Sequence, residues 1–218
     1  MATFSVYMIR HGQTYFNKYR RMQGWCDSPL TAVGEQDARN AGKMLNGIDF
    51  DAVYASDMTR AMRTAELILP ASGNTDLTVQ PMAAFREAFY GYFEGDDTSQ
   101  TWFMVGAPHQ APSLSAIIEQ YGIEKAKDFC KEADPFHRAE NNAEFWQRVT
   151  GGLDTLRAHH HDGDKVLVVS HGNTIYSIAA RFAALTSPAR PQNGSVTKFT
   201  ISDNDVTLDY FGRKDHLD

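Results

Sequence analysis

The sequence of 218 residues has little cysteine, no excess of positive charge and no long hydrophobic run. Its two cysteines, Cys26 and Cys130, lie far apart and form no CxxC pattern, which argues against a disulfide framework or a thiolate zinc site. The net charge of −6 argues against a general nucleic-acid binder, which needs a basic surface. No stretch approaches the roughly 18 apolar residues of a membrane span, and the N-terminal residues do not resemble a secretory signal. We therefore expect a cytoplasmic protein that binds neither nucleic acid nor membrane.

Short apolar runs alternate with amphipathic segments along most of the chain. Residues 6–9 and 166–169 are apolar throughout, as buried strands of a parallel sheet are. This alternation predicts an α/β fold, a three-layer sandwich whose mostly parallel central sheet carries helices on both faces. Expected helices cover residues 34–45, a segment from Arg60 to a stop at Pro70, and residues 143–159 and 173–185, and a final hairpin turns at Asp203–Asn204.

Residues 88–143 lack this regularity. Glycines, prolines and scattered aromatic residues interrupt the segment, and two helices are expected near Leu114–Tyr121 and Ile123–Lys131. We expect this segment to be an insertion that forms a lid over one edge of the sheet, within a single domain of residues 1–218.

Two histidine-glycine turns are the first functional signal. Arg10-His11-Gly12 and Ser170-His171-Gly172 each follow an apolar run, and in open α/β sheets the site lies beyond the carboxyl ends of the strands. The glycines allow a close approach of backbone to a ligand. Three interpretations remain: loop histidines bonded to neighbouring carbonyls, a metal site, or nucleophilic attack by one imidazole on a phosphoryl group. The metal interpretation lacks further ligands at suitable spacing, so we expect no metal.

The residues near these turns favour phosphoryl chemistry. Arg10 adjoins His11, and Arg60 starts a helix after the second predicted strand, so both guanidinium groups can reach phosphoryl oxygens. A polar loop follows at residues 17–24. Glu87 has alanine and aromatic neighbours, a setting that favours a protonated carboxyl able to act as an acid.

Taken in order, these segments resemble the histidine phosphatase superfamily, also called the phosphoglycerate mutase-like fold. The resemblance covers most of the chain outside residues 96–138. It is carried by Ile9-Arg10-His11-Gly12-Gln13-Thr14 with Asn17, by Leu30–Gly34, by Ala55–Ala61, by Arg86-Glu87 with Gly91 and Glu94-Gly95, and by Val169–Gly172.

The resemblance implies a role for each matched residue. His11 would attack phosphorus and form a phosphohistidine, and Glu87 would be the general acid and base. Arg10, Arg60 and His171 would bind the phosphoryl oxygens. Substrate-contact positions would be Asn17, Gln23, Gly24, Tyr90, Gly172 and Asn173. No cofactor is expected, and the partner would be a small phosphorylated metabolite.

The charge of the insertion bears on the reaction. Residues 88–143 contain four basic and nine acidic residues, a net charge of −5, and no pair of adjacent arginines follows residue 21. Such a segment is a poor clamp for a bisphosphorylated sugar acid, which favours a metal-independent phosphomonoester hydrolase. A phosphoglycerate mutase-type phosphotransferase remains an alternative, favoured by the turn His171-Gly172-Asn173. An inactive binding member of the fold is the third, although the intact set of candidate catalytic residues argues against it.

Overall fold

The computed structural model describes residues 3–183, 185, 189–203, 205–215 and 217. Its strands are β1 (Thr3–Arg10), β2 (Ala52–Ala55), β3 (Val79–Pro81), β4 (Lys165–Ser170), β5 (Val196–Ser202) and β6 (Val206–Arg213). Its α-helices are α1 (Tyr15–Lys18), α2 (Ala32–Met44), α3 (Thr59–Ser72), α4 (Thr98–Gly106), α5 (Leu114–Ala133), α6 (Asn142–His159) and α7 (Gly172–Ala183).

The six strands form one mixed sheet in the order β3-β2-β4-β1-β5-β6. The first four strands of this order run parallel, and β5 and β6 add an antiparallel edge next to β1. Side chains of β1 alternate between the two faces: Val6 and Met8 belong to one buried cluster, and Tyr7 and Ile9 to the other. The continuous apolar runs in the sequence are therefore explained by burial on both faces, as expected for a parallel sheet.

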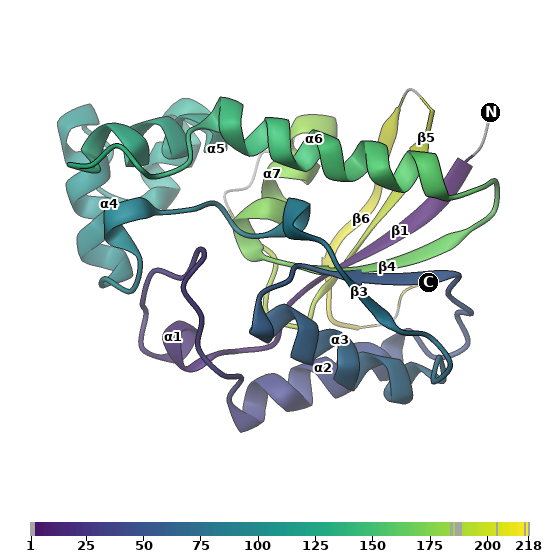
Figure 1. Ribbon diagram of the computed structural model, residues 1–218. Coiled ribbons are helices and arrows are strands. Elements are labelled where there is room, and N and C mark those ends of the chain that lie inside the picture. The colour runs from purple at the N-terminus through teal and green to yellow at the C-terminus, as the bar shows by residue number, and fades with distance from the viewer. Residues whose placement is uncertain (1–2, 184, 186–188, 204, 216, 218) are drawn as a thin grey trace.

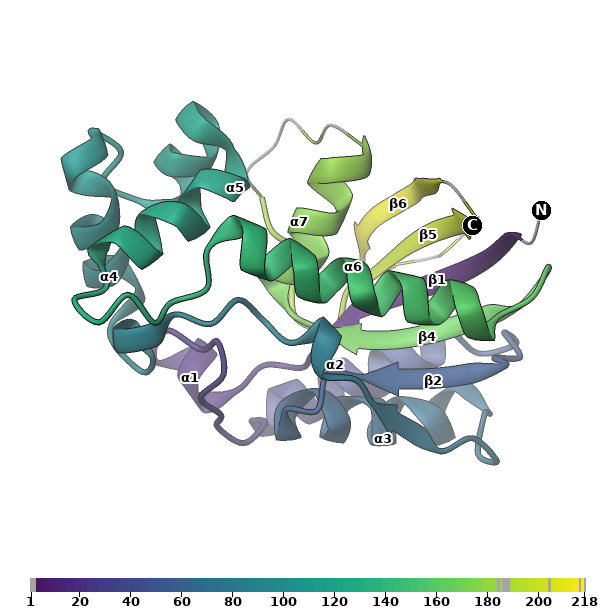
Figure 2. The same cartoon turned by 45° about the horizontal axis from the view of Figure 1, so that its top comes forward.

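Helices cover both faces of the sheet. Helices α2 and α3 pack on one face through small and aliphatic side chains such as Ala41 and Ile68. Helices α6 and α7 cover the opposite face with Phe145, Val149 and Ile175. Figures 1 and 2 show the resulting three layers, which confirm the predicted α/β sandwich.

The insertion lies beyond the carboxyl ends of the parallel strands (Figure 1). Helices α4 and α5 pack on each other, and α5 also contacts α6 and α7. The segment therefore rests on helices at the end of the sheet where the parallel strands finish, and its role as a lid stays a prediction. The grouping of residues 1–218 into one domain stays a prediction.

Several helix boundaries differ from the sequence prediction. Pro70 does not stop α3; it lies in the last turns of the helix, which ends where Gly73 adopts a φ of +87°. By contrast, the two helices expected on either side of Gly122 are confirmed, because the backbone of α5 is non-helical at that glycine, with a φ of +84°. Helix α7 ends at Ala183, short of the predicted residue 185. The predicted hairpin is confirmed by the antiparallel pair β5 and β6, although residue 204 of its turn lies outside the described residues.

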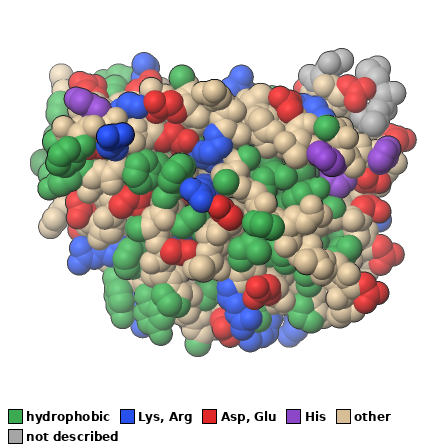
Figure 3. Space-filling view, in the orientation of Figure 1, with side chains coloured by type: hydrophobic (Ala, Val, Ile, Leu, Met, Phe, Trp, Pro, Cys, Tyr) green, Lys and Arg blue, Asp and Glu red, His purple; other side chains and the backbone are tan. Residues whose placement is uncertain are grey.

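Across the described ranges, no helix has the length and apolarity needed to cross a bilayer. On the face shown in Figure 3, acidic and basic side chains are interspersed over most of the surface.

Candidate active site

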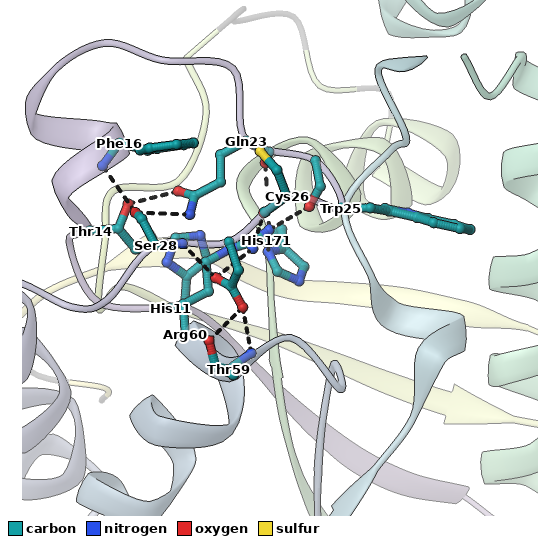
Figure 4. Close-up of polar contacts among 12 residues, drawn as sticks. His11, Thr14, Phe16, Gln23, Trp25, Cys26, Ser28, Thr59, Arg60 and His171 are labelled. Atoms are coloured by element: carbon teal, nitrogen blue, oxygen red, sulfur yellow. Dashed lines mark hydrogen bonds and ion pairs between the residues drawn. The ribbon is translucent and has the colours of Figure 1, made fainter. Parts of the chain in front are cut away.

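The two histidine-glycine turns lie side by side at the carboxyl ends of the two central strands, β1 and β4. Strands β1 and β4 are parallel neighbours, and Arg10 lies opposite Ser170 in their register. The amide N–H of His11 donates to the carbonyl oxygen of Ser170 at 3.0 Å. The rings of His11 and His171 are both buried, and their centroids are 5.1 Å apart (Figure 4). Adjacent parallel strands thus bring together two histidines that are 160 residues apart in the chain.

His11 is held in the form that a nucleophile requires. Its Nδ1 lies 2.8 Å from the carbonyl oxygen of Gly12, and because a carbonyl only accepts, Nδ1 carries the proton. Nε2 of the neutral ring then presents a lone pair. Burial, followed by the charges of Arg60 and Arg10, keeps the pKa of His11 well below its ordinary value of 6.5. The imidazole is therefore neutral and able to attack an electrophile at neutral pH.

His171 has the opposite tautomer. Its Nδ1 lies 3.1 Å from Nη2 of Arg60, which can only donate, so the proton of the neutral ring is on Nε2. Burial and then the charge of Arg60 keep the pKa of His171 well below 6.5. Nε2–H of His171 is buried and has no hydrogen-bond partner.

Two further buried N–H donors near His171 also lack a hydrogen-bond partner. Nε of Arg10 and Nε of Arg60 also lack partners, and with His171 Nε2 they are the only nitrogen donors without partners among the buried side chains that the structure describes. A buried donor without a partner costs about 1–3 kcal/mol. An anionic oxygen is the ligand that would satisfy such N–H groups, so these residues fit a phosphoryl group without a metal.

Arg60 is fixed by the loop that follows α1. The guanidinium group donates through Nη1 to the Cys26 carbonyl at 3.0 Å and through Nη2 to the Gly24 carbonyl at 2.7 Å. Nη1 also pairs with Asp27 at 3.0 Å, and Asp27 accepts from the first N–H of α3, at Thr59. Asp27 therefore caps the helix that carries Arg60, a role that the sequence did not reveal.

The carboxylate of Glu94, from the insertion, organises the same loop. Its two oxygens accept four backbone N–H groups, at 2.9–3.0 Å, from Gly24, Trp25, Cys26 and Tyr90. Because the carbonyls of this loop orient Arg60, the position of Arg60 depends on a carboxylate that does not touch it.

Glu87 binds to the N-terminus of α7. Its Oε2 accepts from the N–H of Asn173 at 2.9 Å, and its Oε1 accepts from the N–H of Thr174 at 3.1 Å. These N–H groups of the first helical turn have no partner within the helix, and the helix dipole favours an anion beside them. The carboxyl group therefore lies among hydrogen-bond donors, and not in the apolar setting that its sequence neighbours suggested.

The hydroxyl of Thr174 can serve both protonation states of Glu87. Its Oγ1 lies 3.1 Å from Oε1 of Glu87 and 2.9 Å from the carbonyl oxygen of Arg86. A hydroxyl carries one hydrogen and can also accept. It can donate to an ionised Glu87, or accept from a protonated Glu87 while donating to Arg86.

Helix α6 holds the segment that presents Glu87. Arg148 donates to the carbonyl oxygens of Ala84, Arg86 and Glu87 at 2.8–3.3 Å and pairs with Glu140. The resulting network fixes the backbone on both sides of Glu87.

A cavity of about 460 Å³ opens above His11. Four arginines and one carboxylate, that of Glu87, line it, so its charge is strongly positive. The lining residues are Arg10, His11, Gln13, Asn17, Arg20, Arg21, Met22, Gln23, Glu87, Tyr90, Thr98, Ser99, Gly172, Asn173, Arg190 and Asn193. Arg60 and His171 lie fully buried next to His11 and do not line the cavity.

Five of the six residues that the family resemblance suggested for substrate contact line the cavity. Asn17, Tyr90, Gly172 and Asn173 line the cavity. Gln23 also lines it, but its amide is hydrogen bonded to the hydroxyls of Thr14 and Ser28 (Figure 4).

Gly24 is not among the lining residues. A Cβ at this position would lie 2.2 Å from Oε1 of Glu94 and 2.3 Å from the carbonyl oxygen of Ala88. Glycine is therefore required by close packing of the loop against the insertion.

Arg20, Arg21, Arg190 and Asn193 are site residues that the sequence analysis missed. Asn193 donates to the carbonyl oxygen of His11 at 2.8 Å and to Oδ1 of Asn17 at 3.2 Å. The Arg20-Arg21 pair lies within the polar loop of residues 17–24 and was a detectable signal in the sequence. Arg190 belongs to no motif, and only the tertiary structure places it at the cavity.

Among the described residues, no group of three or more His, Cys, Asp or Glu side chains could hold a metal ion. In the run His159–His161, His160 is buried and hydrogen bonded to Tyr54 at 3.1 Å and to Asp164 at 3.2 Å.

The lowered histidine pKa values predict that stability falls in acid. His11 and His171 stay neutral in the folded protein, whereas in the unfolded chain they take up protons below about pH 6.5. Their contribution to the free energy of unfolding is complete above that pH and is lost as the pH falls, by at most about 1.4 kcal/mol per pH unit for each histidine. Denaturant unfolding at pH 7, 6 and 5 measures this, and His171→Gln should give a shallower decline. An equal slope in both proteins would contradict the assignment.

Comparison with known proteins places this site in a family. The family model described as histidine phosphatase superfamily (branch 1) matches residues 6–213. A 2,3-bisphosphoglycerate-dependent phosphoglycerate mutase of Afipia carboxidovorans is 31% identical over 183 residues, which are 82% of this chain and 80% of that protein.

Solved structures agree with this match. A phosphoglycerate mutase from Bacillus anthracis superposes with a TM-score of 0.91 at 32% identity, over 98% of this chain and 94% of the other. A mycobacterial glucosyl-3-phosphoglycerate phosphatase gives a TM-score of 0.73 at 25% identity, over 95% and 98% of the two chains. Because the family model matches nearly the whole sequence, this chain belongs to branch 1 of the histidine phosphatase superfamily.

Proposed function

We propose that this protein transfers phosphoryl groups of small phosphorylated acids through His11, in the manner of a phosphoglycerate mutase. One observation carries the proposal. A neutral His11 with a free Nε2 lies among three buried N–H donors without partners, those of Arg10, Arg60 and His171.

In the proposed reaction, Nε2 of His11 attacks phosphorus while the bond to the ester oxygen breaks. The N–H groups of Arg10, Arg60 and His171 bind the phosphoryl oxygens, where charge is concentrated in the transition state. Glu87 gives its proton to the departing alkoxide and then accepts a proton from the hydroxyl that receives the phosphoryl group. The Thr174 hydroxyl supports Glu87 in both states. The Afipia carboxidovorans relative is named as a 2,3-bisphosphoglycerate-dependent mutase, which supports a bisphosphorylated acid as the source of the phosphoryl group on His11.

The cavity supports the mutase alternative over the hydrolase that the sequence analysis favoured. That preference rested on the acidity of residues 88–143, but Glu87 is the only carboxylate among the described residues that line the cavity. Carboxylates of the insertion serve its own structure instead: Asp97 caps α4, and Asp134 accepts backbone N–H groups of residues 136, 138 and 139. Arg20, Arg21 and Arg190 provide positive charge for a second anionic group. The mutases among the relatives favour the same alternative.

The two reactions are separated by their products. Purified protein is incubated with 3-phosphoglycerate, with and without 2,3-bisphosphoglycerate, in the presence of EDTA. The mutase reaction predicts 2-phosphoglycerate formation that depends on the bisphosphate and little inorganic phosphate. Release of inorganic phosphate without isomerisation would instead establish a hydrolase, and neither product in a His11-dependent reaction would refute both.

Hydrolysis stays a second candidate for a specific reason. No Lys or Arg of the insertion is among the residues that line the cavity, so its wall on that side consists of Tyr90, Thr98 and Ser99. A mutase must retain its bisphosphorylated intermediate, and polar, uncharged residues on this side bind it less firmly than cations do.

Replacing Glu94 by glutamine is expected to lower activity about 10- to 100-fold and stability by about 2 kcal/mol, because the amide cannot accept all four backbone N–H groups. The loop then no longer fixes Arg60. Steady-state kinetics and denaturant unfolding check both effects. Glu119→Gln, at an exposed position of the same insertion, is the matched control. Wild-type activity of Glu94→Gln would show that the loop positions Arg60 without this carboxylate.

A further inference from the structure

Arg190 stands at the rim of the cavity, in the segment that precedes β5. Its Nη1 donates to Oδ1 of Asn173 at 3.4 Å, and Asn173 donates through Nδ2 to the hydroxyl of Tyr90 at 2.6 Å. The guanidinium group is thus held by a residue of α7, while its exposed remainder faces the cavity that His11 also lines.

Arg190 lies close to the proposed phosphoryl site. After burial, its charge is the largest cause that lowers the pKa of Arg10, to about 10. The backbone explains the proximity, since Nη1 of Arg10 donates to the carbonyl oxygen of Pro191 at 2.8 Å. Arg20 and Arg21 line the same cavity but are not among the main causes that lower the pKa of Arg10 or His11. Two neighbouring guanidinium groups repel each other unless anions lie between or beside them.

We propose that Arg190 is a specificity-determining residue that binds a second anionic group, a carboxylate or a phosphate, on the part of the substrate that is not transferred. This inference rests on the proposed phosphoryl transfer at His11 and adds how the remainder of the substrate is recognised. Arg10, Arg60 and His171 are used by the transferring group, so a second anion needs its own cation. The proximity of Arg190 to Arg10 requires that only a short carbon chain separates the two anions.

A matched pair of ligands tests the proposal. 3-Phosphoglycerate and glycerol 3-phosphate share a three-carbon phosphomonoester and differ in a carboxylate at the far carbon. Calorimetry measures both dissociation constants on a His11→Ala background, where turnover does not interfere. The carboxylate should tighten binding about 10-fold or more, as expected for a charge-assisted hydrogen bond. With Arg190→Gln this preference should disappear, and Arg190→Lys should restore part of it.

Arg138→Gln, at an exposed position in the insertion away from the cavity, is the control and should retain the preference. Three results would overturn the role of Arg190: no preference with Arg190 present, an undiminished preference in Arg190→Gln, or an equal weakening of both ligands. The proposed reaction can fail separately. If the wild-type protein shows no His11-dependent turnover but the preference for the carboxylate still depends on Arg190, the proposed reaction is refuted and the role of Arg190 stands.

Discussion

Replacing His11 by alanine is expected to reduce phosphoryl transfer by about 10⁴-fold or more, because the variant lacks the only atom proposed to bond to phosphorus. The pocket around residue 11 should persist, since the ring bonds only through Nδ1 to the adjacent Gly12 carbonyl. The measurement is turnover of 3-phosphoglycerate, together with trapping of the phosphorylated protein. Wild type should form a phosphoprotein that is lost in acid and stable in alkali, as a phosphohistidine is.

His161→Ala is the matched control, because that side chain is 89% exposed and lies outside the cavity. It should retain both turnover and labelling. Phosphoprotein formation in His11→Ala would mean that another nucleophile carries the phosphoryl group and would refute the proposed mechanism.

Replacing Glu87 by glutamine is expected to lower transfer from alkyl phosphates by about 10³-fold, within the range for removal of a general acid. The amide is nearly isosteric and its oxygen can still accept from the N-terminus of α7, so the fold should be retained. The amide cannot donate a proton to the departing alkoxide. Single-turnover measurement of phosphoprotein formation isolates this step.

The leaving group makes this test specific to acid catalysis. With p-nitrophenyl phosphate the departing phenolate needs no proton, so phosphoprotein formation in Glu87→Gln should fall far less than with an alkyl ester. Glu94→Gln, which acts on Arg60, should slow both substrates to a similar extent. Equal losses for both substrates in Glu87→Gln would assign Glu87 a structural role at α7 and refute its role as an acid.

The parts of the fold that follow local rules were predictable. Residues 166–169 are apolar throughout and lie within β4, where they are buried, and the pattern around residue 203 predicted the β5–β6 pair. The position of Pro70 inside α3 was not predictable from the sequence. Ile68 and Leu69 are held by packing against the sheet, and Gly73 sets the end of the helix. Tertiary packing there outweighs the cost that a proline brings to a helix.

The acidic composition of residues 88–143 favoured a hydrolase in the sequence, but it does not describe the charge of the cavity. The insertion has a net charge of −5, but salt screens exposed charges beyond about 8–10 Å, so the position and orientation of each carboxylate matter more than their number. Glu94 and Asp134 turn toward backbone N–H groups, and the arginines of the cavity come from the end of β1 and from loops outside the insertion.

The sequence by itself determined the family, the α/β sandwich and the two histidine-glycine turns at strand ends, because strand periodicity and a short motif are local properties of the chain. The tertiary structure decided the two histidine tautomers, the helix N-terminus that binds Glu87, and the presence of Arg190 beside Arg10. Each of these depends on which donor faces which acceptor across segments distant in sequence, and that pairing arises only when the sheet and its helices are packed together.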